Sequence, residues 1–81
     1  MDSIIVDTTY DPQADAGYIS FDRIAPGEAA RQILVEDEEL GPFSVILDVD
    51  SHGKLLGIEL LGVTQIVARP RLSANREGHK E

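Results

Sequence analysis

The sequence predicts a mainly β fold, a small antiparallel meander of four to five strands with one short helical turn, and leaves an α+β fold as the alternative. Three observations predict it. Apolar residues recur at every second position over several short runs, as they do in a strand with one buried face. The links between these runs are short and contain Gly and Pro, which is typical of antiparallel neighbours. The 81 residues leave room for one domain.

Each strand prediction comes from a run of β-branched or alternating residues. The predicted strands are residues 4–6, 17–23, 30–36, 43–50 and 55–61. Residues 43–50 have the clearest period of two, with apolar side chains on one face and mostly polar ones on the other. Residues 55–61 place Leu56, Ile58 and Leu60 on a common face. Apolar residues also occur on the opposite faces of these last two strands, so covering one side of the sheet would leave a second apolar set exposed.

The connectors carry turn signals. Residues 51–54 can close a tight hairpin in which Gly53 supplies a positive φ. Residues 11–15 are typical of one helical turn, because Asp11 can cap it and Pro12 fits the first helical position. The composition of residues 28–40 is compatible with either a strand or a helix. We favour a strand there, since four consecutive acids follow it and would suit a helix C-terminus badly.

Charge divides the chain into two parts. The formal net charge is -8, and the bases are concentrated after residue 66. We therefore expect one domain over residues 1–67 and a flexible basic tail over residues 68–81. An acidic body argues against nucleic acid as a partner. The short apolar runs argue against a membrane span and the amino terminus against a signal peptide, and the absence of Cys favours a cytoplasmic location.

One stretch has the spacing of a calcium-binding loop. Asp48, Asp50, Gly53 and Glu59 fall at the positions where an EF-hand needs carboxylates and a sharp turn. His52 stands where that loop needs an oxygen ligand, and strands rather than helices flank it. We therefore interpret this stretch as a strand-turn-strand with outward polar residues, and we expect no metal and no cofactor.

Other chemistry is sparse. His52 lies in a predicted turn and His79 in the predicted tail, and no nucleophile motif or phosphate-binding loop is present. A second carboxylate group, Asp7, Asp11 and Asp15, would come together only if one end of the sheet gathered it. The sequence predicts no catalytic residue, so we expect the protein not to be an enzyme.

Two longer motifs resemble a known family. The first contains Tyr10, Asp11, Pro12, Asp15, Tyr18 and Ile19; the second contains Asp48, Asp50, Gly53, Gly57, Ile58, Glu59 and Leu61. In this order they resemble the bacterial family called domain of unknown function 2283, over roughly residues 4–63. The chain departs from the family pattern at His52, at Leu60 and in the long segment 28–42. The family has no assigned activity, so the resemblance implies a fold rather than a reaction. Members similar to this chain are sometimes encoded beside small toxin-like proteins, which implies a regulatory partner.

The motif residues also have physical interpretations. Gly57 would let a backbone or a bulky ring approach the last strand closely. Tyr10 and Tyr18 flank the capped turn, where they could pack together or close one end of the core.

These observations predict an uncharacterised noncatalytic interaction module. It would self-associate as a homo-oligomer or bind a small basic protein partner. Binding to such a partner could be an antitoxin-like form of regulation. The alternative is a small-ligand or divalent-metal-binding domain that uses the carboxylates named above. The sequence does not identify the partner or the biological process.

Overall fold

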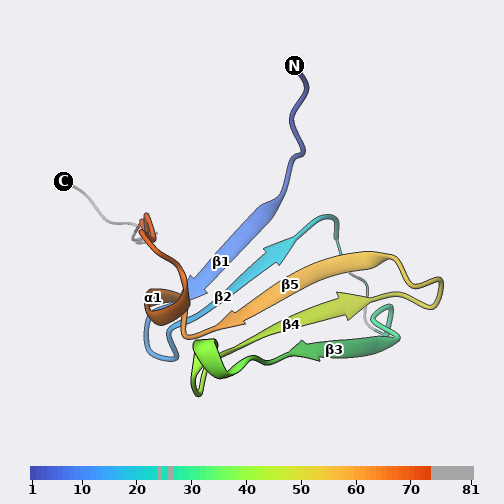
Figure 1. Ribbon diagram of the computed structural model, residues 1–81. Helices are drawn as coiled ribbons and strands as arrows, with labels where there is room; N and C mark the ends of the chain where they lie inside the picture. The colour runs from blue at the N-terminus through green and yellow to red at the C-terminus, as the bar shows by residue number, and fades with distance from the viewer. Residues whose placement is uncertain (24, 26, 74–81) are drawn as a thin grey trace.

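The computed structural model describes residues 1–23, 25 and 27–73. Its elements are β1 (Asp7–Asp11), β2 (Ala16–Ser20), β3 (Arg31–Val35), the 3-10 helix η1 (Glu38–Leu40), β4 (Ser44–Val49), β5 (Leu55–Leu61) and α1 (Val63–Ile66). The strands form one antiparallel sheet (Figure 1). The predicted mainly β, antiparallel fold is confirmed.

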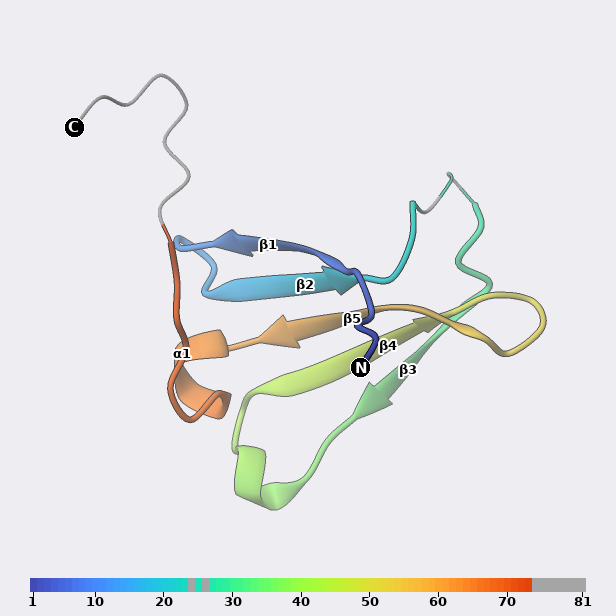
Figure 2. The same ribbon diagram turned by 90° about the horizontal axis from the view of Figure 1, so that it is seen from above.

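The strand order in the sheet is β1-β2-β5-β4-β3. β1 and β2 form one hairpin, while β3, β4 and β5 follow one another as a meander. The two units join where β2 pairs with β5, so the link from β2 to β3 leads from the inside of the sheet to its far edge. Figure 2 shows the strands stepping across a curved single layer with α1 at one end.

The first predicted strand is displaced. Residues 4–6 lie outside the sheet, and the edge strand is Asp7–Asp11 instead. The reason lies in the partner strand, because Asp7 pairs with Ser20, the last residue of β2. The chain bends at Phe21, whose N–H donates to the Leu56 carbonyl oxygen. Residues before Asp7 therefore have no strand to pair with, and Figure 1 shows this segment rising away from the sheet.

Local signals determine most of the connectors. Residues 28–40 contain the predicted strand, β3, followed by η1, which Asp37 caps by accepting a hydrogen bond from the Glu39 N–H. Gly53 has a φ of 79° in the β4–β5 hairpin, as predicted. The helical turn predicted at residues 11–15 is a hydrogen-bonded turn instead. It ends at Asp15, whose φ is 52°, and the α-helix is α1.

The strand registers divide the side chains between two faces of the sheet. We call one side the apolar face; its residues are Ile19, Ile33, Val35, Val45, Leu47, Ile58 and Leu60. We call the other side the polar face; its residues are Asp7, Thr9, Asp11, Tyr18, Ser20, Gln32, Ser44, Asp48 and Glu59, with Leu34, Ile46 and Leu61 among them. Apolar side chains on both sides of β4 and β5 were expected from the sequence.

The core of a single chain is small. Among the described residues, the buried hydrophobic side chains are Val49, Leu56 and Val63, and none of the described side chains is less than 2% exposed. Val63 comes from α1 and packs over Gly17 at one end of the sheet, where an added Cβ would lie 3.0 Å from a Val63 methyl group. Because α1 has only four residues, it covers that end, and residues 71–73 line a cleft with the first hairpin, Ile19 and Leu60. The apolar side chains of β3 and β4 have no second layer among the described elements (Figure 1).

The predicted boundary between body and tail falls just after α1. Residues 74–81 of the predicted basic tail lie outside the described residues. Among the described residues, no helix has both the length and the apolar character needed to cross a membrane.

Candidate functional site

A tyrosine and an aspartate from the two motifs meet on the polar face. The Tyr18 hydroxyl on β2 donates to Asp48 Oδ2 on β4 at 2.7 Å, across the intervening strand β5. Asp48 is 9% exposed, and its Oδ1 accepts from Gln32 Nε2 on β3 at 3.0 Å. These three side chains therefore form a polar chain across four strands, with the buried carboxylate satisfied on both oxygens.

Gly57 makes this contact possible. It lies on β5 directly between Tyr18 and Asp48, and the tyrosyl side chain passes over it. An added Cβ would overlap the hydroxyl, lie 2.5 Å from Cζ of the ring and lie 2.8 Å from the Ile19 carbonyl oxygen. The expectation that Gly57 admits a bulky ring is confirmed, and the ring belongs to Tyr18.

The surroundings of Tyr18 keep its hydroxyl protonated. Burial raises the pKa of Tyr18 to about 12, assisted by the hydrogen bond to Asp48 and by the negative charges of Asp48 and Glu59. Glu59 is the cross-strand neighbour of Tyr18 on the same face. At neutral pH the phenol is therefore a hydrogen-bond donor, and it cannot act as a base because its oxygen keeps its proton.

A second cluster fastens α1 to the first hairpin. Asp15 Oδ1 accepts from the Tyr10 hydroxyl at 2.8 Å, and its Oδ2 accepts from the Thr64 hydroxyl at 2.7 Å. The Thr64 N–H also donates to the carboxylate, and the N–H groups of Gly62 and Val63 donate to the Asp15 carbonyl oxygen. Asp15 thus caps a helix that lies far along the chain. The hydrogen bonds from Thr64 and Tyr10 lower the pKa of Asp15.

The remaining motif residues shape turns. Asp11 Oδ1 accepts from the Gln13 N–H at 3.0 Å, which organises the turn that Pro12 opens. Asp50 Oδ1 accepts from the N–H groups of His52 and Lys54 at 2.8 and 2.9 Å, next to Gly53. The hydrogen bond from Lys54, together with that from His52, lowers the pKa of Asp50.

The carboxylates with calcium-loop spacing do not converge. Asp48 and Glu59 share the polar face, whereas Asp50 follows a β-bulge and turns into the hairpin loop. The other predicted group also separates, because Asp7 and Asp11 lie on β1 while Asp15 faces α1. Within the described part of the chain, no three His, Cys, Asp or Glu side chains come together in a way that could hold a metal ion. The interpretation as a strand-turn-strand is confirmed. The expectation that its polar residues point outward is wrong for Asp48, which is buried because Tyr18 and Gln32 hydrogen-bond to it.

The structure also corrects and extends the set of predicted residues. Tyr10 and Tyr18 do not pack together, because the register places them on opposite faces of the sheet. Thr64 and Gln32, which complete the two clusters, were not predicted. No pattern in the sequence indicates Gln32, and the only signal for Thr64 is its place just after Gly62, at the start of a short apolar segment.

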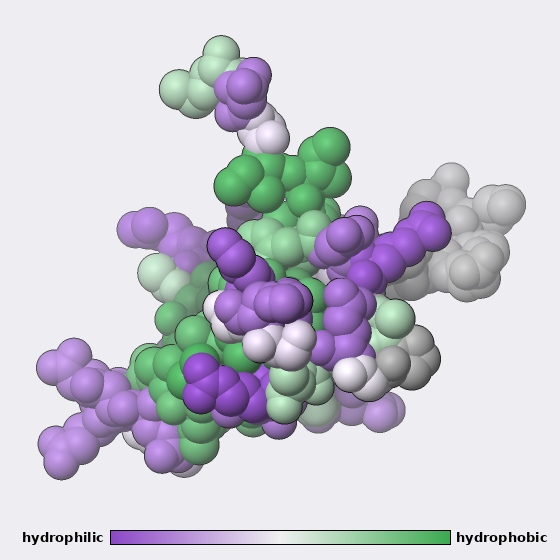
Figure 3. Space-filling view, turned by 90° about the vertical axis from the view of Figure 1, so that its right-hand side faces the viewer, coloured by the Kyte–Doolittle hydropathy of each residue, from purple (hydrophilic) through white to green (hydrophobic). Residues whose placement is uncertain are grey.

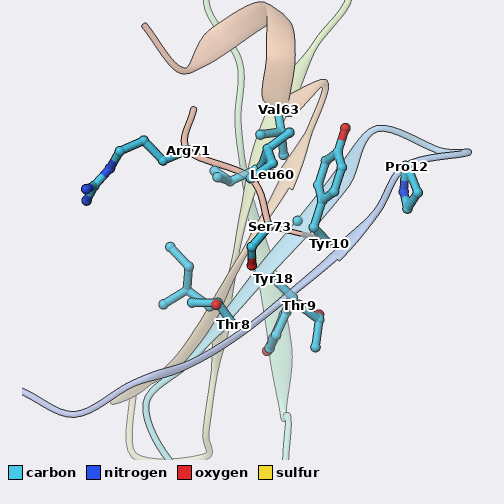
Figure 4. Close-up of a pocket in the computed structure, with 12 residues that line it drawn as sticks. Thr8, Thr9, Tyr10, Pro12, Tyr18, Leu60, Val63, Arg71 and Ser73 are labelled. Carbon is cyan, nitrogen blue, oxygen red and sulfur yellow. The ribbon is translucent and has the colours of Figure 1, made fainter. Parts of the chain in front are cut away.

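A cleft of about 1170 Å³ lies over the first hairpin and the end of β5 (Figure 4). Its walls are Thr8, Thr9, Tyr10, Pro12, Gly17, Tyr18, Ile19, Leu60, Val63, Arg71, Leu72 and Ser73. Neither a carboxylate nor an imidazole is among these residues, and Arg71 points away from the other labelled side chains. The lining is therefore a mixed hydroxyl and aliphatic surface without an acid–base pair.

Together these features define a class of small open-sheet domain, in which a Tyr–Asp hydrogen bond spans the sheet and a motif aspartate caps the following helix. The family model described as protein of unknown function (DUF2283) matches residues 7–63, and the chain belongs to this family. The matched region contains every residue of both clusters except Thr64, and it confirms the family resemblance of the two motifs. Searches of curated proteins and of solved structures found no match to this chain.

Proposed function

We propose that this chain is a noncatalytic interaction module, which acts by packing the apolar face of its sheet against another protein surface. The observation that carries the proposal is that face itself. Seven aliphatic side chains from four neighbouring strands form it, and all seven keep part of their surface exposed; Val35 is 41% exposed. Figure 3 shows hydrophobic side chains reaching the surface along the left of the view, which is the near side in Figure 1.

The side chains of this face lie in continuous cross-strand rows. One row consists of Ile19, Ile58, Leu47 and Ile33, which are successive partners on β2, β5, β4 and β3. Neighbouring aliphatic side chains in such a row shield one another, but a sheet gains most of its stability when a second layer packs on it. A chain of 81 residues without disulfides has little other core to rely on. The face is therefore a binding surface rather than an ordinary exterior.

The contacts of the motif residues support a noncatalytic role. Several polar groups that the sequence singles out already hydrogen-bond within the chain: Tyr18 to Asp48, Tyr10 to Asp15, and Asp50 to its own turn. A catalytic acid or base needs a free, oriented site and a pKa near the working pH. The pKa of Tyr18 lies far above neutrality, and those of Asp15 and Asp50 lie below their usual range.

The same contacts weigh against the alternative of a ligand or divalent-metal site. Asp48 accepts two side-chain hydrogen bonds, so coordinating a cation would require breaking them. Asp50 is similarly occupied by two N–H groups of the hairpin turn. An interaction module can also bind a regulatory partner, as in an antitoxin-like pairing in the bacterial cytoplasm. The experiment below would identify such a partner.

Two neighbouring residues on edge strand β3 give a matched test. Val35 is on the apolar face and 41% exposed, while Leu34 is on the polar face and 53% exposed. Tagged wild-type, Val35→Glu and Leu34→Glu chains are expressed in the native host, recovered at low salt and analysed by mass spectrometry. The proposal predicts a stoichiometric protein, either untagged chain or another protein, with wild type and Leu34→Glu but not with Val35→Glu. Recovery of the tagged chain alone in all three cases would refute it.

A further inference from the structure

We infer that the surface that covers the apolar face is a second copy of the same chain, packed face to face to form a two-layer β-sandwich. This inference rests on the proposed function and names its partner. Three properties of the described strands support it: the distribution of charge between the two faces, the size of the apolar face, and the position of α1.

The distribution of charge between the two faces indicates which partner the apolar face binds. Every acidic residue of the strands, namely Asp7, Asp11, Asp48 and Glu59, lies on the polar face. The apolar side of the strands has a single charged residue, Arg31, which pairs with Val49 near the start of β3. Two chains that each have a net charge of -8 repel one another wherever acids face acids. The apolar face is the side on which two copies can meet without opposing carboxylates.

The same distribution argues against a basic protein on this face. A cationic partner gains specificity and speed of association from complementary negative charge at the contact. The strands have negative charge only on the polar face, so a basic protein would bind there and not on the aliphatic rows of the apolar face. A copy of the chain matches the apolar face in polarity, because an isologous contact pairs a surface with itself.

The size of the face suits a modest dimer. Strands lie about 4.8 Å apart and rise about 3.3 Å per residue, so the four strands of the apolar face, at five residues each, span roughly 19 by 17 Å, or about 320 Å² per copy. Patches of this size are among the largest on ordinary monomers and usually have a function. Two such faces together give about 640 Å² in projection, below the roughly 1,200 Å² at which stable interfaces begin, and the uneven surface of the side chains adds to this area. We therefore expect a reversible dimer that dissociates on dilution.

The position of α1 leaves the contact open. The helix packs over Gly17 at one end of the sheet, on the β2 end of the row that runs through Leu60 and Val45 to Val35. The neighbouring row, from Ile19 to Ile33, passes through the middle of the sheet. Its Ile19 end lines the cleft that Val63 and residues 71–73 also line, whereas Ile58, Leu47 and Ile33 are not among the residues of that cleft. In a two-layer sandwich with sheets about 10 Å apart, this row would meet its counterpart in the other copy at the centre.

Sedimentation velocity of the purified full-length chain over a wide concentration range tests the inference. Wild type and Leu34→Glu should sediment as dimers that dissociate on dilution. Val35→Glu would place a carboxylate in the contact of each copy, so its dimer dissociation constant should rise about a hundredfold or more. Val35→Lys should weaken the dimer similarly, because either charge would be buried without a partner.

Two results would overturn the inference. One is a wild-type chain that stays monomeric at every concentration; the other is Val35→Glu and Leu34→Glu dimers of equal strength. A monomeric wild type that still captures a stoichiometric basic protein, lost with Val35→Glu, would overturn the second-copy assignment while leaving the proposed function intact. Far-UV circular dichroism checks that each variant is folded. If Val35→Glu does not fold, Val35→Thr keeps the β-branched shape and should still weaken the dimer about tenfold.

Discussion

Replacing Gly57 by alanine should strongly destabilise the domain. The new Cβ would occupy the space of the Tyr18 hydroxyl and lie 2.8 Å from the Ile19 carbonyl oxygen, which is backbone and cannot swing away. Overpacking of this kind costs about 1–3 kcal/mol, and losing a hydrogen bond to a charged acceptor, here Asp48, costs about 1.5–3 kcal/mol. Alanine also lowers the conformational entropy of the unfolded chain, which offsets this destabilisation by up to about 1 kcal/mol. The net loss is about 3 kcal/mol, most of the stability expected for a domain of this size.

Urea unfolding followed by circular dichroism, at one fixed protein concentration, measures this loss. Gly53→Ala is the matched control: its φ is 79° and an added Cβ meets nothing within 4 Å, so it should cost only about 1–2 kcal/mol of backbone strain. In a Tyr18→Ala background, Gly57→Ala should lose much of its effect, because only the Ile19 carbonyl oxygen then opposes the Cβ. Equal costs for Gly57→Ala and Gly53→Ala, or equal costs of Gly57→Ala in the two backgrounds, would refute the reasoning.

Three further predictions concern the two clusters and the carboxylates. Tyr18 keeps its proton to about pH 12 in the folded chain but loses it near pH 10 when unfolded, so the free energy of unfolding should fall between these pH values. Urea titrations should show a shallower fall for Tyr18→Phe, and an identical fall would contradict the assignment. Asp15→Ala should lower the urea midpoint at neutral pH by freeing the start of α1. The folded pKa of Asp15 is lowered, so its contribution to the free energy of unfolding is present above the usual carboxyl pKa and is lost as the pH falls through the folded pKa. A difference in urea midpoint between Asp15→Ala and wild type that persists in acid would argue against this role. Calcium, magnesium, manganese and zinc should leave the melting temperature unchanged, whereas a metal at 100 times its dissociation constant would add about 2.7 kcal/mol of stability.

Local signals in the sequence predicted the strands that have strong alternation. The bounds of β5 match the prediction, and Gly53 takes the positive φ that the hairpin requires. Residues 4–6 were misplaced because β-branched residues indicate only a preference for extended backbone. Whether such a run joins a sheet depends on its partner, and β2 ends at Ser20, opposite Asp7.

The two clusters depend on long-range pairing, which periodicity does not contain. Tyr18 meets Asp48 only because β2 neighbours β5, a strand pairing that joins distant parts of the chain. Gly57 gave a usable signal, since a glycine inside a strand indicates a close approach. The identity of the approaching ring followed only from the register. Asp15 gave no such signal, because its partner helix α1 has four residues and is too short to show a helical period.

Thiol reactivity shows whether a second copy covers the apolar face in solution. The chain contains no cysteine, so Val35→Cys and Leu34→Cys each introduce one thiol, at neighbouring positions on opposite faces. In the single chain the two positions are 41% and 53% exposed, so on their own they would react at similar rates. If a second copy covers the apolar face, the thiol of Val35→Cys reacts far more slowly than that of Leu34→Cys at high protein concentration, and the difference disappears on dilution. Similar rates for the two variants at every concentration would contradict it.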